Sequence, residues 1–190
     1  MKLSAPYKGA DSAHISQHFK TGVHPALDMV QESKTYGYGT PLCAPENCEV
    51  LFFEESKLTP DVDGYITKGR GIFMKGLETG QVHLYWHTLP VFPVRVGDLV
   101  RRGQIVAYMG NAGLVYSNNV YVPIAERRTT FRGTHLHWEV YSPEYRLGGA
   151  KPFVNFEDQV DWTLQPTYGN KEIITATTAV LGKISKIIST

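Results

Sequence analysis

The stretch that decides the fold is Val96-Gly-Asp-Leu-Val-Arg-Arg-Gly-Gln-Ile-Val-Ala-Tyr-Met109. It holds two valine-bearing strand ends that are punctuated by turn residues, first at Gly97-Asp98 and again at Gly103. Between residues 41 and 110 no run of ten or more residues has the 3.6-residue apolar period of a helix. Short apolar runs alternate with turns instead, and the expected strands are Glu49–Phe53, Gly71–Lys75, Val82–His87, Ile105–Met109 and, further on, Thr134–Tyr141. The sequence therefore predicts an all-β fold with mainly antiparallel sheets.

The composition agrees with this fold class. The chain has 190 residues, enough for one domain with its own core. Its 18 Gly, 11 Pro and 11 Tyr favour short strands and tight turns over a helical bundle. We expect one domain over residues 1–165 and a C-terminal extension over 166–190, whose apolar, Thr-rich end would form a helix or a frayed linker. Residues 111–132, rich in Asn, Tyr and Arg, are predicted to be a long loop.

The charge and the apolar content exclude some classes of partner. Nineteen basic residues against 18 acidic ones give a net charge of +1, and no basic stripe indicates nucleic-acid binding. No apolar run approaches the roughly 20 residues of a transmembrane helix. The start, Met1–Tyr7, lacks the apolar segment of a secretory signal, so we expect export by another route or from a precursor. The oligomeric state is left open.

The two cysteines, Cys43 and Cys48, flank a predicted turn, Ala-Pro-Glu-Asn. Two reduced thiols is the preferred interpretation, and a hairpin disulfide or half of a metal-binding knuckle are the alternatives. A structural zinc would need two more soft ligands, and the sequence has no second cysteine pair.

Two histidine motifs lie far apart in the chain. His135 and His137 are separated by one residue, so in a strand both imidazoles would leave the same face while Leu136 and Trp138 pack the core. Without other support, such a pair also fits two surface histidines on a sheet.

The other motif is His24-Pro-Ala-Leu-Asp28, in which Pro25 disfavours a regular helix. A loop that enters a strand could aim both side chains at one point. A histidine from each motif and one carboxylate make up the three-ligand set of a catalytic zinc, which keeps a fourth position for water. Such a site cleaves amide or ester bonds.

A third element is His83-Leu-Tyr-Trp-His87. Strand alternation places His83, Tyr85 and His87 on one face, so a second strand could offer an imidazole to the same pocket. We interpret His83 itself as a solvent-facing residue or one that supports the site from behind. His14 and His18 are expected at the surface.

Taken together, these pieces resemble the M23 family of zinc metallopeptidases, the lysostaphin-like or LytM-type cell-wall endopeptidases. The resemblance covers roughly residues 13–157 in order. It rests on Ile15-Ser-Gln-His-Phe19, His24-x-x-x-Asp28, Gly39-Thr-Pro-Leu-Cys-Ala-Pro45, Leu84-Tyr-Trp-His87, Val94–Gly113, Gly133-Thr-His-Leu-His-Trp-Glu-Val140 and Pro152-Phe-Val-Asn155. The chain departs from the family pattern at Leu114–Arg132, where the family usually has a short link, and at Tyr36–Gly39 and Leu58–Gly71.

The resemblance implies a LytM/lysostaphin-like barrel-sandwich and one bound Zn²⁺. Its ligands would be His24, Asp28 and His137, and His87 and His135 would stay unligated beside the metal. One of these two histidines would take the proton from the attacking water, and the pair would stabilise the oxyanion and protonate the leaving amine. The sequence does not decide which of the two is the base. Gly133 and Thr134 would shape the approach to the metal.

The function this implies is a zinc endopeptidase that cuts peptide bonds in bacterial peptidoglycan, in the cross-bridge or the stem. It would act at the wall, on the extracellular or periplasmic side, and a phage lysin or virion-associated hydrolase is one setting. The alternative is a catalytically inactive LytM-like regulatory domain that binds or activates another hydrolase; such domains lose ligands that this chain keeps. A biotinyl or lipoyl carrier also has the Val-x-Val-Gly-Asp pattern, but the nearest candidate, Lys75, lies on the wrong side of it.

Overall fold

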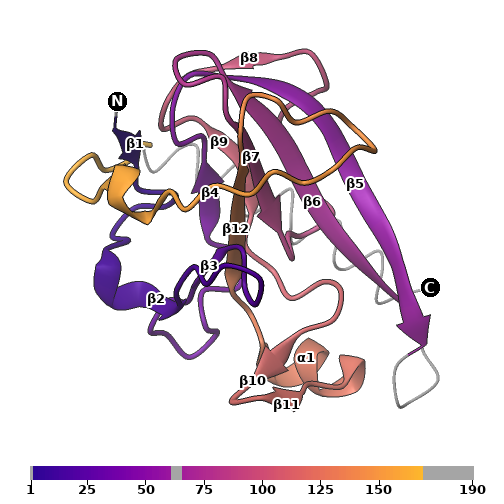
Figure 1. Cartoon of the computed structure of the whole chain (residues 1–190). Helices are drawn as coiled ribbons and strands as arrows, with labels where there is room; N and C mark the ends of the chain where they lie inside the picture. The colour runs from indigo at the N-terminus through magenta and orange to yellow at the C-terminus, as the bar shows by residue number, and fades with distance from the viewer. Residues whose placement is uncertain (1, 61–65, 169–190) are drawn as a thin grey trace.

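The main element of the fold is a seven-stranded antiparallel sheet (Figure 1), in a computed structural model that describes residues 2–60 and 66–168. Its strands, in spatial order, are β2 (Ile15–Gln17), β3 (Leu27–Met29), β12 (Leu136–Tyr141), β7 (Val82–Trp86), β6 (Ile66–Gly76), β5 (Cys48–Pro60) and β8 (Leu99–Val100). The predicted C-terminal helix or linker falls largely on residues 169–190, which lie outside the described part, so that prediction stays untested, as does the boundary at residue 165.

Three small sheets surround the large one. β4 (Pro41–Cys43) pairs antiparallel with β9 (Ile105–Tyr108), and β10 (Tyr116–Ser117) pairs antiparallel with β11 (Val120–Tyr121). β1 (Leu3–Ser4) and β13 (Val160–Asp161) form a parallel pair. The described helices are α1 (Ile124–Thr130) and two 3₁₀ turns, Ser12–His14 and Glu157–Gln159. The all-β, mainly antiparallel prediction is confirmed, and among the described strands the large sheet stays open, with β2 and β8 at its edges.

The double turn predicted around Gly97 and Gly103 is confirmed. Both glycines have positive φ, 86° and 78°, which a residue with a Cβ adopts only with strain. The Asp98 carboxylate accepts a hydrogen bond from the backbone N–H of Arg95 at 2.8 Å and so closes the first turn. β8 lies between the two turns and pairs with β5, which makes this stretch the edge of the sheet.

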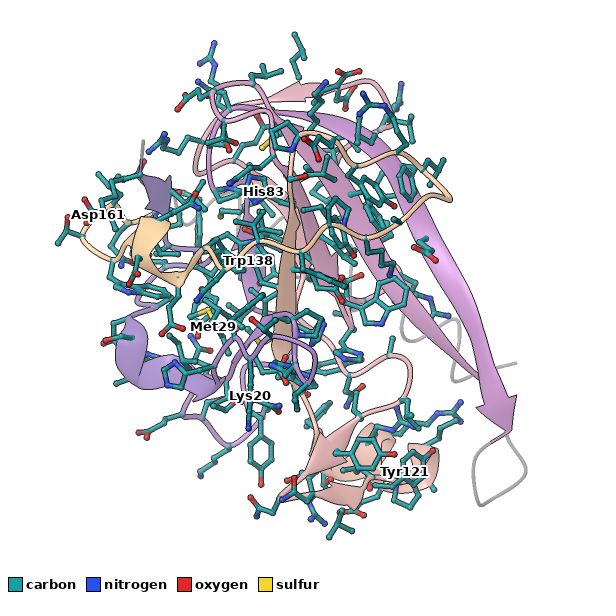
Figure 2. The ribbon with its side chains drawn as sticks, in the orientation of Figure 1. Lys20, Met29, His83, Tyr121, Trp138 and Asp161 are labelled. Carbon is teal, nitrogen blue, oxygen red and sulfur yellow. The ribbon has the colours of Figure 1, made fainter. Side chains whose placement is uncertain are left out.

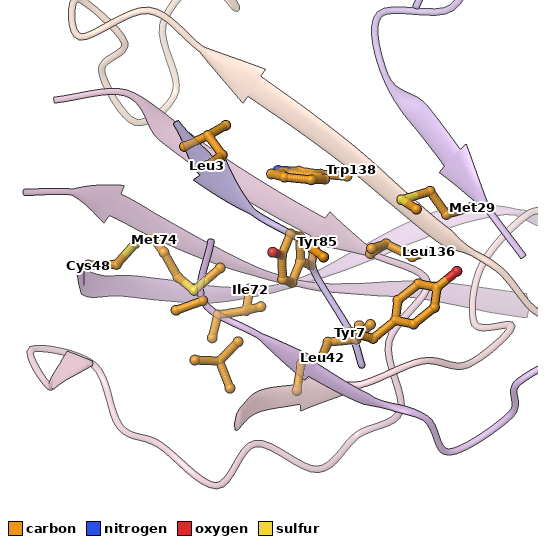
Figure 3. Close-up of a cluster of buried hydrophobic side chains, with 14 of the residues drawn as sticks. Leu3, Tyr7, Met29, Leu42, Cys48, Ile72, Met74, Tyr85, Leu136 and Trp138 are labelled. Carbon is orange, nitrogen blue, oxygen red and sulfur yellow. The ribbon is translucent and has the colours of Figure 1, made fainter. Parts of the chain in front are cut away.

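The main core lies between the large sheet and the β4–β9 pair (Figure 3). Leu136 and Trp138 of β12 are fully buried in it, as the alternation in the sequence predicts. Tyr85 of β7 joins them, with its ring 5.6 Å from that of Trp138. Its hydroxyl donates to the backbone carbonyl of Cys43 at 2.8 Å, which ties the two sheets together.

A second apolar cluster covers the opposite face of the sheet. Phe73 of β6 stacks there against Tyr141 and Tyr145, with ring centroids 6.2 and 6.1 Å away. Tyr145 belongs to the segment after β12, which runs across this face and is orange in Figure 1. Because apolar side chains cover both faces of the sheet here, β12 is held rigidly. Packing on both faces therefore fixes the position of the side chains at the N-terminal end of this strand.

The prediction of a plain loop over residues 111–132 is wrong. The segment forms the β10–β11 hairpin followed by α1. The hairpin turns at Asn118-Asn119, whose φ angles of 52° and 61° match the left-handed pair that a two-residue turn needs. The helix has only 7 residues and no apolar stripe, since its one buried side chain is that of Arg127. Neither element therefore has a strong apolar period in the sequence.

The expected strands are otherwise confirmed, but two of them are longer than predicted. β5 and β6 pair from Cys48 with Gly76 to Pro60 with Ile66, so they form a hairpin that reaches well beyond the predicted segments (Figure 1). Cys43 and Cys48 are both buried and form no disulfide, which agrees with the preferred interpretation of two reduced thiols. No helix in the described residues is both long and apolar enough to cross a bilayer.

Candidate metal centre

Two of the predicted ligands lie directly opposite each other in the sheet. β3 and β12 pair so that Asp28 and His137 are cross-strand partners. The His137 Nδ1 atom lies 2.7 Å from Asp28 Oδ1. Both side chains point away from the main core, because their neighbours in the two strands, Leu27, Met29, Leu136 and Trp138, fill it.

The third predicted ligand comes from a tight turn before β3. The backbone N–H of His24 donates to the Lys20 carbonyl at 2.8 Å, and this turn brings the imidazole over Asp28. The His24 Nε2 atom lies 3.2 Å from Asp28 Oδ2. One donor atom from each of His24, Asp28 and His137 lies within 4.8 Å of the others, so the structure brings the three predicted ligands together.

Outer contacts fix which ring nitrogen of each histidine faces the centre. The Nδ1 of His24 donates to the His18 carbonyl at 3.2 Å, and the Nε2 of His137 lies 2.9 Å from Glu139 Oε1. Glu139 also accepts a hydrogen bond from the Tyr141 hydroxyl. The other nitrogen of each ring thus faces Asp28, and a metal ion would bind there once that nitrogen has given up its proton.

The arrangement fits a metal ion. Although His24 Nε2 is buried, it makes no hydrogen bond to any residue that the structure describes. It faces a carboxylate oxygen, which is also an acceptor, and a cation between the two would satisfy both. Two imidazole nitrogens and one carboxylate are a common donor set for zinc.

His87 and His135 complete the cluster on its inner side. Their ring centroids are 4.5 Å apart, and that of His87 is 5.7 Å from His137. The Nδ1 of His87 donates to the Ala112 carbonyl at 2.6 Å, and the Nδ1 of His135 to the Gly133 carbonyl at 2.9 Å. Both rings therefore keep Nε2 free of these contacts.

His87, His135 and His137 also have donor atoms within 4.8 Å of one another. This second group shares His137 with the first, so the five side chains form a single site. We prefer the group with Asp28 as the ligand set, because it includes a carboxylate that balances the charge of a divalent cation.

The route by which His87 reaches the site differs from the one that alternation predicts. Tyr85 and His83 lie opposite Trp138 and Val140 in the pairing of β7 with β12, so they face the main core. Simple alternation would send His87 to that face as well. β7 ends at Trp86, however, and His87 has a left-handed backbone with φ of 62°. This turn directs its ring toward His135 and His137.

The electrostatics divide the site into a charged and a neutral part. Burial opposes ionisation of Asp28, but the hydrogen bond from His137 and the nearby His24 imidazole outweigh it and hold its pKa well below the usual range. Burial likewise disfavours protonated His137, yet Asp28 and Glu139 raise its pKa to about 9. Burial, assisted by neighbouring histidines, holds the pKa of His87 well below the usual range, and burial also lowers that of His135. The latter two rings are therefore neutral proton acceptors at neutral pH.

The cluster opens into a cleft of about 590 Å³. Its wall is completed by side chains outside the cluster that carry no formal charge. They come from β2, from the loop before β4, from the insertion 114–132 and from the segment just before β12: Ser16, Gln17, Val30, Tyr36, Leu114, Tyr116, Ser117, Asn118, Asn119 and Thr134. Gly133 and Thr134 border this cleft, as expected. The insertion therefore forms one side of the approach to the site.

Other histidines lie outside the site. The interpretation of His83 as a solvent-facing residue or a support of the site is wrong, since it is fully buried and its Nε2 lies 3.0 Å from Glu46 Oε1. In Figure 2 it lies near the end of the sheet away from Lys20 and Tyr121. His14 and His18 pair with Asp11 and Glu157 near the surface.

One site residue that the sequence analysis missed is Glu139, although its position two residues after His137 on the same strand face is a usable signal. The backbone carbonyls of Ala112 and Gly133, which hold the two inner histidines, leave no such signal in the sequence, because carbonyl acceptors are common to all residues.

No protein-family model matches the sequence, and no curated protein does. Similar solved structures include the catalytic domain of the antimicrobial peptidase lysostaphin from Staphylococcus simulans, with 18% identity over 76% of this chain and 86% of that one and a TM-score of 0.47. Helicobacter pylori Csd3 has 18% identity over 97% of this chain and 42% of its own, with a TM-score of 0.49. A putative glycyl-glycine endopeptidase lytM from Ruminococcus gnavus has 25% identity over 68% of this chain and 42% of its own, with a TM-score of 0.42.

The chain thus spans less than half the length of the last two proteins. Because each TM-score is below 0.5, the functional argument rests on the residues of this chain.

Proposed function

We propose that the chain is a zinc-dependent endopeptidase that hydrolyses peptide bonds in bacterial peptidoglycan. The observation that carries the proposal is the convergence of His24 Nε2, Asp28 and His137 Nδ1 beside two neutral imidazoles at the base of one cleft. The three converging groups would hold the ion. Zinc bound there would acidify water and polarise the carbonyl of the scissile bond.

The two inner histidines would move the protons. The Nε2 lone pair of His87 or His135 would accept a proton from the attacking water, and the Nε2–H formed on that ring would then donate to the oxyanion or to the leaving amine. The Ala112 and Gly133 carbonyls hold the Nδ1–H of each ring, so each ring keeps one orientation throughout. Burial disfavours the imidazolium, which favours transfer of the proton onward to the leaving amine.

Peptidoglycan as the substrate rests on the motif resemblance, with the uncharged cleft wall as support. A cleft of this size, lined by tyrosine, serine and asparagine side chains, suits an extended peptide that is bound through hydrogen bonds. The protein would act on peptides of the wall, from the extracellular or periplasmic side, and a phage-encoded lysin would be one source. The regulatory alternative gains no support, because all five site residues are present and grouped.

The test separates metal binding from proton transfer. His137→Ala should lose both zinc, measured by elemental analysis of the purified protein, and the release of peptide fragments from purified walls, measured by mass spectrometry. His135→Ala should keep zinc and lose activity. His14→Ala is the matched control, because this histidine pairs with Asp11 outside the site, and it should change neither quantity. Wall cleavage that persists after verified removal of zinc would contradict the proposal.

A further inference from the structure

The inserted segment carries a buried arginine that the proposed chemistry does not use. Arg127 lies in α1 and its side chain is only 4% exposed. A buried guanidinium is costly unless its donors are satisfied. The burial of Arg127 therefore needs an explanation other than the stability of a helix of 7 residues.

The Arg127 side chain binds the short segment 110–113, which is called the strap below. The Nη1 atom donates to the Asn111 carbonyl at 2.9 Å and to the Gly113 carbonyl at 2.5 Å. The Asn111 side chain in turn donates to the Arg127 carbonyl at 3.4 Å. These contacts fix the backbone on both sides of Ala112.

Ala112 is the residue whose carbonyl accepts the hydrogen bond from His87 Nδ1. The strap is also held close to the ring, because a Cβ on Gly113 would lie 2.8 Å from the Gly69 Cα of β6 and 3.5 Å from His87 Nδ1. One residue earlier than Asn111, the Gly110 carbonyl accepts the backbone N–H of His135 at 3.3 Å. The strap 110–113 thus contacts both inner histidines.

We infer that Arg127 is a positioning residue, which holds the Ala112 carbonyl in place and so fixes the tautomer and orientation of His87. The inserted segment is then part of the machinery for proton transfer as well as a wall of the cleft. This inference rests on the proposed function for its kinetic part. The state of the His87 ring can be measured without any turnover.

The kinetic test compares two arginines of the same helix. In Arg127→Met the Ala112 carbonyl loses its restraint, and we expect kcat to fall about 100-fold with KM within about twofold, since a misplaced catalytic group costs rate more than binding. Zinc content and circular dichroism should match the wild type. Arg128→Met, which changes an exposed arginine next in sequence, is the control and should leave kcat unchanged.

A conservative variant separates positioning from mere stability. The ammonium group of Arg127→Lys can donate to the same two carbonyls, so it should recover most of the lost kcat. A purely structural role would lower the folded fraction and leave the kcat of each folded, zinc-loaded molecule unchanged. Should Arg127→Met fail to fold, the lysine variant still gives a kcat and a ring state that the inference predicts to be near those of the wild type.

The second readout is ¹⁵N NMR of the imidazole of His87 in the metal-free protein. The wild type should show one tautomer with the proton on Nδ1, and Arg127→Met should show a mixture of the two. An unchanged His87 tautomer in folded Arg127→Met, or a wild-type kcat in that variant, would overturn the inference. Absence of wall cleavage by the wild type would instead count against the proposed function alone, because the tautomer measurement does not depend on it.

Discussion

Two carboxylate–imidazole pairs in this molecule have the same chemistry and different surroundings. Glu46 and His83 are fully buried, and Glu46 also accepts hydrogen bonds from the backbone of Glu78 and Thr79 and from the Thr79 hydroxyl at 2.6 Å. Asp28 and His137 lie at the base of the cleft, where Asp28 also faces His24 and His135 and where His137 contacts Glu139. The Glu46 carboxylate is satisfied by donors of the fold, whereas the Asp28 carboxylate faces two further imidazoles, those of His24 and His135, which separates a structural pair from a candidate functional one.

The largest effect is expected from the Asp28–His137 pair in the cleft. Asp28→Ala should lower wall cleavage by about 1,000-fold or more, because several kcal/mol of transition-state stabilisation are lost with the metal. The unfolding free energy of the metal-free protein should fall less than in a Glu46→Ala variant, measured by denaturant titration. A variant that kept zinc and activity would remove the distinction between the pairs.

The Glu46–His83 pair should show the opposite pattern, a loss of stability without a loss of kcat. Glu46→Ala leaves His83 and the backbone donors of Glu78 and Thr79 buried without their acceptor, so we expect a loss of about 3 kcal/mol in the unfolding free energy. The kcat of the folded, zinc-loaded variant should equal that of the wild type. A specific loss of kcat without destabilisation would show that the pair serves catalysis.

The contact between Glu139 and His137 should have an intermediate effect. Glu139→Gln removes the anionic acceptor behind His137 Nε2, and we expect zinc affinity to fall about 10- to 100-fold, measured by competition with a chelator. Glu157→Gln is the matched control, because Glu157 pairs with the exposed His18 at 2.7 Å. Equal affinities for the two variants would rule out a role for Glu139 in metal binding.

The smallest effect concerns the pH dependence of stability. Burial opposes ionisation of Glu46, but His83 and Thr79 outweigh it and lower its pKa. The stabilisation from this lowered pKa is fully present above the unfolded pKa of about 4.3 and is lost as the pH falls through the lower folded value. The difference in unfolding free energy between the wild type and Glu46→Gln should therefore be constant above about pH 5 and shrink below about pH 4. A constant difference down to about pH 3 would contradict this assignment.

Strand alternation predicted much of the fold and part of the site. It placed Leu136 and Trp138 in the core, and it therefore placed His137 on the opposite face of the strand, where the site lies. It could not predict the ring direction of His87, which depends on a left-handed backbone one residue past the end of β7. Such a conformation is set by the tertiary contacts of a residue, and the strand period says nothing about it.

The inserted segment was the hardest part to predict. Its hairpin turns on Asn118-Asn119 without a glycine, and its helix buries an arginine in place of an apolar stripe. The Arg127 Nη1 atom donates to carbonyls 14 and 16 residues away, and a carbonyl acceptor has no signal in the sequence. The same holds for the strap that orients His87.

The cross-strand pairing of Asp28 with His137 joins residues 109 positions apart in the chain. An unfolded chain cannot hold these two groups together without paying the entropy of closing that loop, so a metal ion would bind the folded state far better than the unfolded one. Bound zinc would then stabilise the pairing of β3 with β12 in the folded protein. Each tenfold excess of zinc over its dissociation constant would add about 1.4 kcal/mol to the unfolding free energy. Removal of the ion would leave the same sheet more open to proteolysis, so loss of activity and loss of durability would come together.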